Sequence, residues 1–249
     1  MLSDLTTGFI GRLRARDPQA WFELWETFGP ILRSQLAKWG GGRIGAETVQ
    51  DLSQETLAAL ADAIDRHDPD RGARFSTWLL AIAKHSLYGE IDRRMAQKRG
   101  AGRAAGELDE ELHGRESAPD APYETAVFHA KVEAALRLVE RESDFLEFSV
   151  YRMRVLDGRT GREVAEALGI SEPTVSRRLA RVRDALRVRL VEVMTKYSFT
   201  DDEAREAERN GLQTNPNKAD DALFDEAVAE IMHRQQDLRA TDRAAAARP

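Results

Sequence analysis

The sequence predicts an all-α protein in which two small helical domains are joined by a flexible acidic linker. Apolar residues recur at helical spacing along most of the chain, and almost no stretch shows the alternation of a strand. Two stretches rich in Gly, Pro and polar residues, at 100–122 and 210–221, lack any apolar period. We therefore expect helical domains at 5–99 and 123–197, the linker at 100–122, and an acidic C-terminal extension of unknown role at 198–249.

Composition excludes several classes of protein. With 249 residues, 42% apolar and 32% charged, the chain is typical of a soluble globular protein. No apolar run approaches the roughly 18 to 20 residues of a membrane span, and the N-terminal residues lack the apolar centre of a signal peptide, so we expect a cytoplasmic protein. There is no cysteine, and the five histidines show no metal-ligand spacing. Because no nucleophile motif or phosphate loop is present either, we expect no catalytic residue, no metal and no cofactor.

The net charge of −6 hides a basic remainder. Residues 104–124 carry seven acids and one base, and residues 198–249 carry twelve acids and seven bases. These two segments hold −6 and −5, so the rest of the chain holds +5. The predicted domains are therefore free to bind nucleic acid.

Three helices are predicted in the first domain. Asp17 followed by Pro18 is an N-cap signal, and Ser76 is a candidate N-cap for the third helix. The middle helix, near 46–66, places its apolar residues on one side and a polar group on the other, formed by Asp51, Gln54 and Glu55. On pattern alone, such a polar face is most often just solvated.

The third helix has a basic and aromatic outer side. Lys84, His85 and Tyr88 fall opposite its buried stripe, and the helix ends in a basic stretch that contains Arg93 and Arg94. Single-stranded DNA needs cations for its phosphates and flat side chains for its unstacked bases, so this side is a candidate for binding it. The alternative for the aromatic residues at the start of the helix, Phe75 and Trp78, is packing in the core.

The second domain has the pattern of a helix-turn-helix. Thr160 and Glu163 form a capping box, Gly169 ends that helix, and Ser171 caps the next one. The outward side of this second helix carries Thr174, Arg177, Arg178 and Arg181. In a helix-turn-helix the second helix enters the major groove, where arginines bind guanine or phosphate. The alternative is a surface helix that is rich in arginine for solubility.

Three motifs in their order resemble the extracytoplasmic-function (ECF) group of bacterial RNA polymerase sigma factors. They are DLSQET at 51–56, IDRHDPDRGARFSTWLLAIAK at 64–84, and VLDGRTGREVAEALGISEPTVSRRLARVRDALR at 155–187. The resemblance covers residues 10–195. Each motif alone has modest specificity for the family, whereas the three motifs in this order are highly specific.

The resemblance implies a sigma factor that binds core RNA polymerase and directs promoter-specific transcription initiation. Its partners would be the polymerase and promoter DNA, both duplex and single-stranded, and a separate anti-sigma factor stays open. The implied polymerase-binding residues are Asp51, Leu52, Gln54 and Glu55. The implied residues for melted minus-10 DNA are Arg66, His67, Asp68, Arg71, Arg74, Phe75, Lys84, His85, Tyr88, Arg93 and Arg94. The implied residues for minus-35 duplex DNA are Ser171, Thr174, Ser176, Arg177, Arg178 and Arg181.

One residue departs from the family pattern, and one alternative function stays open. Pro173 departs from the family pattern at an early position of the second helix of the helix-turn-helix, called the reading helix below. Proline is nevertheless tolerated in the first turn of a helix. A stand-alone helix-turn-helix regulator would also explain residues 160–189, but it would leave DLSQET and the first domain without a role.

The C-terminal extension has helical patterns of its own. Thr200 is a candidate N-cap, and a later helix would have an apolar stripe of Leu223, Phe224, Ala227, Ile231 and Leu238. One hypothesis is that this acidic helix folds back on the basic DNA-binding surfaces and restrains them. Deletion of residues 198–249 would then raise promoter binding. The alternative is a weakly ordered tail that keeps the protein in solution.

Overall fold

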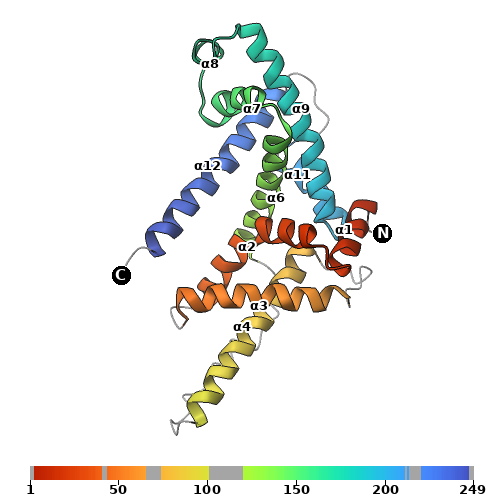
Figure 1. The fold of residues 1–249 in the computed structure, drawn as a ribbon, viewed down its shortest axis with the longest axis vertical. Coiled ribbons are helices and arrows are strands. Elements are labelled where there is room, and N and C mark those ends of the chain that lie inside the picture. The colour runs from red at the N-terminus through yellow and green to blue at the C-terminus, as the bar shows by residue number, and fades with distance from the viewer. Residues whose placement is uncertain are drawn as a thin grey trace. The chain divides into compact units, whose positions relative to one another are not determined.

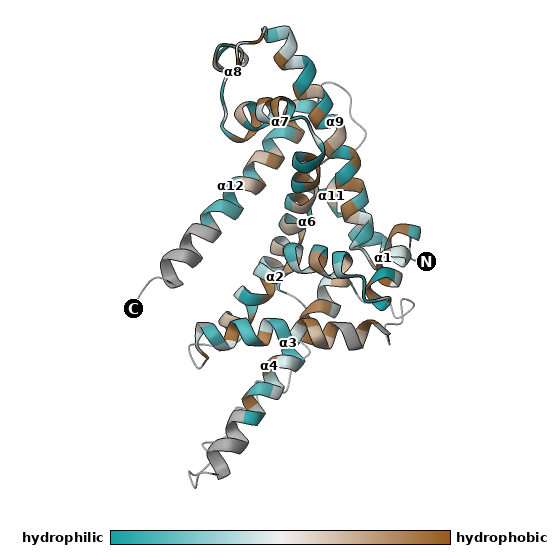
Figure 2. Cartoon of the chain, in the orientation of Figure 1, coloured by the Kyte–Doolittle hydropathy of each residue, from teal (hydrophilic) through white to brown (hydrophobic). Residues whose placement is uncertain are grey.

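The predicted all-α class is confirmed. The computed structural model describes residues 3–40, 44–65, 74–100, 120–210, 212 and 220–246, and these form helices and turns without a strand (Figure 1). The chain divides into two compact units, one of residues 7–127 and one of residues 128–249 together with 2–6. Figure 2 shows teal and brown alternating along the helices of each unit, as expected of amphipathic helices. None of the helices in the described ranges is long and apolar enough to cross a membrane.

The first unit is built on four helices whose apolar sides meet in one core. They are α1 (Asp4–Arg14), α2 (Pro18–Gly40), α3 (Ala46–Asp65) and α4 (Phe75–Gly100). Helix α3 packs against both α2 and α4. The large buried side chains of this core include Leu13, Leu24, Phe28, Leu32, Leu36, Leu52, Leu60, Phe75, Leu79 and Leu87. The C-terminal half of α4 extends beyond the helices against which it packs (Figure 1).

The predicted start of α2 is confirmed. The Asp17 carboxylate accepts a hydrogen bond from the backbone amide of Gln19 at 2.9 Å, and Pro18 is the first residue of the helix. Arg12 donates to the same carboxylate at 2.6 Å. This hydrogen bond, followed by that of Gln19, lowers the pKa of Asp17.

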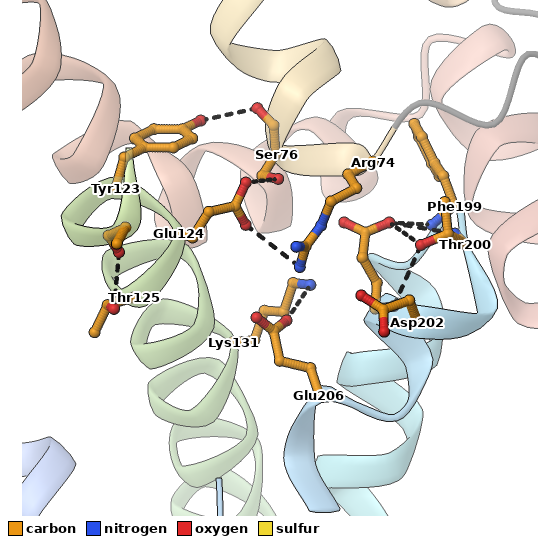
Figure 3. A network of polar contacts seen from close by, with 12 residues as sticks. Arg74, Ser76, Tyr123, Glu124, Thr125, Lys131, Phe199, Thr200, Asp202 and Glu206 are labelled. Atoms are coloured by element: carbon orange, nitrogen blue, oxygen red, sulfur yellow. Dashed lines mark hydrogen bonds and ion pairs between the residues drawn. The ribbon is translucent and has the colours of Figure 1, made fainter. Parts of the chain in front are cut away.

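Helix α4 begins two residues earlier than the Ser76 cap predicts, since a cap at Ser76 would make Thr77 the first helical residue. The helix starts at Phe75, and Ser76 is fully buried inside its first turn. Its hydroxyl donates to Glu124 of α6 (Ala121–Glu142) at 2.7 Å, while the Tyr123 hydroxyl donates to the Ser76 carbonyl at 3.2 Å (Figure 3). Ser76 therefore joins α4 to residues that follow the predicted linker, which a local capping rule does not foresee.

The second unit contains the helix-turn-helix and the C-terminal extension. Its helices are α6 (Ala121–Glu142), whose first turns belong to the first unit, then α7 (Phe145–Tyr151), the π-helix η2 (Arg152–Leu156), α8 (Gly161–Leu168), α9 (Glu172–Lys196), α10 (Asp201–Ala204), α11 (Glu206–Arg209) and α12 (Asp221–Ala246). A buried ion pair between Lys131 of α6 and Glu206 of α11, at 3.5 Å, ties the extension to this unit (Figure 3).

The helix-turn-helix forms as predicted. Thr160 and Glu163 make both hydrogen bonds of the capping box, and Gly169 ends α8 in the left-handed conformation with φ of 65°. Behind the turn, Val150, Val164, Ala165 and Val175 form a buried cluster. The side chain of Ser171 does not cap α9 but hydrogen-bonds the hydroxyl of Thr174 at 2.9 Å. The turn therefore fixes the start of α9 against α8.

His129 makes the stability of the second unit depend on pH. Its side chain is buried in α6, and burial, followed by the nearby Arg234, lowers the pKa of the imidazole despite the opposing charge of Glu230. Because the unfolded chain binds this proton more readily, the free energy of unfolding should fall as pH decreases below the ordinary histidine pKa of about 6.5. The slope from one such group is at most about 1.4 kcal/mol per pH unit.

We expect the variant His129→Gln to lose this dependence. Urea unfolding followed by far-UV circular dichroism between pH 8 and pH 5.5 measures it, since that window lies mostly above the ordinary titration range of the carboxylates. Equal slopes in the wild type and the variant would contradict the assignment to His129.

Candidate functional site

The first two turns of α9 present the predicted reading residues to solvent. Ser171, Ser176 and Arg177 are exposed, and Thr174 is half-buried. Arg177 donates to the Thr174 hydroxyl at 3.3 Å and to the Pro173 carbonyl at 3.3 Å. Helix α9 holds Pro173 in its first turn, where proline is tolerated because the backbone N–H there has no partner within the helix.

Two further reading residues are paired with acids of α7. Arg181 donates to Glu147 at 2.9 Å, and the Nη1 atom of Arg178 lies 3.6 Å from the same carboxylate. Asp144, whose side chain caps α7, lies 3.7 Å from that Nη1 atom. Sequence reasoning missed these acids. Asp144 with Glu147 three residues later is the pattern of a helix start, but no local pattern shows that Glu147 reaches α9.

The acidic extension binds the other side of α9. Arg183 donates to both oxygens of Asp225, at 3.0 and 2.6 Å, and to Asp221 at 2.7 Å. Arg187 donates to Asp221 at 2.9 Å, and its guanidinium lies 4.6 Å from the centre of the Phe224 ring. The two arginine side chains are only 9% and 5% exposed. Helix α12 is therefore a packed part of the second unit.

Helix geometry separates this contact from the reading residues. An α-helix turns by about 100° per residue, so positions nine apart lie about 180° from each other. Arg183 is thus opposite Thr174, and Arg187 is opposite Arg178. The acidic helix does fold back on arginines of α9, but not over the residues expected to read DNA. The expected gain in promoter binding after deletion of the extension stays an untested prediction.

The apolar stripe of α12 differs in part from the predicted one. Phe224, Val228 and Ile231 are buried, whereas Leu223 is 62% exposed. The predicted inward position of Leu223 is wrong because the pairing of Asp221 and Asp225 with Arg183 sets the rotation of the helix. The side chain of Leu238 lies outside the described residues.

The predicted polymerase-binding residues lie on α3. Asp51, Gln54 and Glu55 are exposed on one side of this helix, as expected. Leu52, by contrast, is 1% exposed and packs in the core of the first unit. Its side chain therefore holds α3 in place and does not itself form part of the exposed face. The Glu55 carboxylate lies 3.9 Å from Arg93 of α4.

The outer side of α4 carries only part of the predicted minus-10 set. His85 is exposed, Lys84 and Tyr88 are half-buried, and the Lys84 ammonium lies 5.4 Å from the centre of the Trp39 ring. Arg93 is nine residues from Lys84 and therefore about 180° away around the helix. It pairs with Glu90 and faces Glu55 of α3, so it does not continue the surface of Lys84 and Tyr88.

The residues around the start of α4 are largely occupied by the fold. Phe75 is 1% exposed, with its ring 4.9 Å from that of Phe28 and 6.0 Å from that of Trp78. Arg74 pairs with Glu124 at 3.4 Å (Figure 3). Core packing, the alternative for Phe75, is the arrangement found. Arg66, His67, Asp68 and Arg71 lie outside the described residues, as does the side chain of Arg94.

The described parts of the chain contain no group of three or more His, Asp or Glu side chains arranged to hold a metal ion. What they do contain is an exposed polar and basic start of a reading helix in one unit and an exposed acidic side of α3 in the other. Such a pair of surfaces suits a protein that binds duplex DNA and a second macromolecule.

Family comparisons agree with both units. The model of sigma-70 region 2 matches residues 24–97, inside the first unit, and the model of sigma-70 region 4 matches residues 146–186, inside the second. No curated protein matches the chain.

The fold and the two matched regions define a sigma factor, the class of protein that binds core RNA polymerase and directs it to promoters. The chain belongs to the sigma-70 family and, by its form of region 4, to the ECF group. Its partners are core RNA polymerase and promoter DNA. The region 2 match accounts for the first unit, and nothing in the described residues favours a stand-alone regulator.

Proposed function

We propose that the two units divide the work of promoter recognition between them. In the first unit, Asp51, Gln54 and Glu55 bind core polymerase, while Lys84, His85, Tyr88 and the segment 66–74 handle melted minus-10 DNA. In the second unit, the start of α9 reads minus-35 duplex DNA. The observation that carries the proposal is that Asp51, Gln54 and Glu55 of α3 and the start of α9 are exposed. They lie on two folded units that are matched separately by sigma regions 2 and 4.

Energetics explain why the polymerase must take part. Stacking is worth about 1.4 kcal/mol per base-pair step, so opening about ten pairs costs about 14 kcal/mol. A captured base returns only about 1 to 3 kcal/mol. The few aromatic and basic side chains on the outer side of α4 cannot cover this difference. The polymerase must therefore supply the remaining free energy of melting. We also propose that the protein has no catalytic activity of its own and works in the cytoplasm, where polymerase and promoter DNA are found.

Loss of the α3 face should abolish polymerase binding. We expect the wild type to co-elute with sigma-free core polymerase in gel filtration, and the triple variant Asp51→Ala, Gln54→Ala, Glu55→Ala to elute alone. The three side chains are exposed, so the variant should keep its fold, which circular dichroism checks.

A matched control removes the same chemical groups elsewhere. Asp201→Ala, Glu208→Ala, Gln236→Ala also deletes two exposed acids and one exposed glutamine, all in the second unit. This control should co-elute with polymerase. If both variants bind equally well, α3 is not the docking helix; if the wild type itself does not bind, the division of work proposed for the first unit fails.

A further inference from the structure

The start of α7 places an acid between two arginines of the reading helix. The Glu147 carboxylate accepts a hydrogen bond from Arg181 at 2.9 Å and lies 3.6 Å from the Nη1 atom of Arg178. Its helix is anchored at this point, because Asp144 caps α7 by accepting from the amide of Leu146 at 2.9 Å. Phe148 and Tyr151 of the same helix are buried. Glu147 is therefore held by a rigid element.

The two arginines are held to different degrees. The side chain of Arg178 is 26% exposed and that of Glu147 is 20% exposed, so this pair is mostly shielded from water. The side chain of Arg181 is 71% exposed and is fixed only at its guanidinium. Arg177, in contrast, is paired with no acid among the described residues and donates to Thr174 and Pro173.

An acid in this place affects phosphates and bases differently. Attraction to phosphates depends on net positive charge and carries no sequence information. Reading a base edge depends on a guanidinium that is held in the correct direction. A carboxylate beside two arginines therefore weakens their attraction to phosphates and holds their guanidinium groups in the direction that base reading needs.

We infer that Glu147 is a positioning residue that sets sequence discrimination by aiming Arg178 and Arg181 and weakening their pull on phosphates. The inference rests on the proposed role of α9 in reading minus-35 DNA. Removing the negative charge in Glu147→Gln should strengthen binding to unrelated sequence and reduce the preference for the correct one. For a pair of this exposure the change is about two- to fivefold.

The experiment uses holoenzyme assembled from core polymerase and the full chain. The probes are a promoter duplex selected by wild-type holoenzyme from a randomised pool, and the same duplex with its minus-35 half scrambled. Competition between them gives an affinity ratio. Since both probes meet the same preparation, this ratio does not depend on the folded fraction, which a purely structural role of Glu147 would change.

Two variants accompany Glu147→Gln. Glu142→Gln removes the same charge and breaks another ion pair of α9, with Arg189 at 2.8 Å, away from the reading surface. Arg181→Ala tests α9 itself. We expect Glu147→Gln and Arg181→Ala to lower the ratio and Glu142→Gln to leave it unchanged.

The outcomes distinguish a failure of the role inferred for Glu147 from a failure of the assignment of α9 to minus-35 DNA. If Arg181→Ala lowers the ratio and Glu147→Gln does not, Glu147 has no positioning role and the reading helix stands. If Glu142→Gln lowers the ratio as much as Glu147→Gln does, the effect is one of general charge and the inference is overturned. If neither Arg181→Ala nor Glu147→Gln changes the ratio, both the inference and the assignment of these arginines to minus-35 DNA fail.

Discussion

Replacing Asp221 and Asp225 with alanine is expected to lower the free energy of unfolding of the second unit by about 3 to 5 kcal/mol, the usual cost of leaving one half of a buried ion pair without its partner. This double variant would leave the guanidinium groups of Arg183 and Arg187 buried without these carboxylates. Burial by itself lowers the pKa of Arg183, but the hydrogen bond with Asp225, together with the charges of Asp225 and Asp221, helps to raise it above its ordinary value. The pairing is therefore what makes burial of this charge tolerable.

The same change should release α12. Phe224, Val228 and Ile231 bury their side chains, but the first of them lies under Arg187 at 4.6 Å and depends on the position of that arginine. His233 adds one contact with the carbonyl of Leu156 at 2.8 Å. We expect that these contacts alone do not hold the helix, so proteolysis should cut the variant between residues 212 and 246 far faster than the wild type.

The aromatic residues offer an internal control. All four tryptophans, Trp21, Trp25, Trp39 and Trp78, lie in the first unit. Tryptophan fluorescence therefore reports the first unit alone, while far-UV circular dichroism reports helices of both. In urea, the Asp221→Ala, Asp225→Ala variant should shift the part of the circular dichroism transition that fluorescence does not follow.

A charge-matched variant completes the test. Glu226→Ala, Glu230→Ala removes two exposed acids of the same helix that do not touch Arg183 or Arg187. Its transition should stay close to that of the wild type, since exposed ion pairs contribute about 0 to 1 kcal/mol. Equal losses in the two variants would show that the acidity of α12 matters and the Arg183 pairing does not.

The second large effect is expected at the start of α9. Arg177→Ala should weaken binding of holoenzyme to its selected promoter duplex by about 1 to 3 kcal/mol, the range for a lost bidentate base contact. Arg177 is exposed and is not paired with an acid in the part of the chain that the structure describes, so its guanidinium is available to DNA. The variant should also accept more sequences at the base pair that the wild type selects.

Discrimination distinguishes this role from simple charge. Loss of a phosphate contact weakens binding to all sequences equally, whereas loss of a base contact weakens it most for the correct sequence. Arg209→Ala, which breaks an exposed pair with Asp202 at 2.7 Å in the extension, is the control for the removed charge. A uniform loss across selected and scrambled duplexes would assign Arg177 to the phosphate backbone.

Local signals in the sequence were enough to predict several elements. Thr160 with Glu163, and Gly169 after Leu168, specify the limits of α8 because capping hydrogen bonds and a left-handed glycine involve residues only a few positions apart. Asp17 and Pro18 specify the start of α2 in the same way. The apolar period likewise predicted which side of α3 is buried, and with it the exposure of Asp51, Gln54 and Glu55.

Partners that are distant in the chain could not be predicted by these rules. Glu147 and Arg181 are 34 residues apart, and Arg183 and Asp225 are 42 residues apart. Their meeting depends on how whole helices pack, which local spacing does not encode. The same reason explains why Ser76 bonds Glu124 rather than capping α4.

The sequence by itself determined the all-α class, the helix-turn-helix and the order of motifs that marks a sigma factor, because helical periods, caps and short motifs are local properties. Only the tertiary structure decided which arginines of α9 stay open and which are covered. Six arginine positions along one helix differ little in local chemistry, but rotation about the helix axis brings Arg178 and Arg181 to the acids of α7 and Arg183 and Arg187 to those of α12.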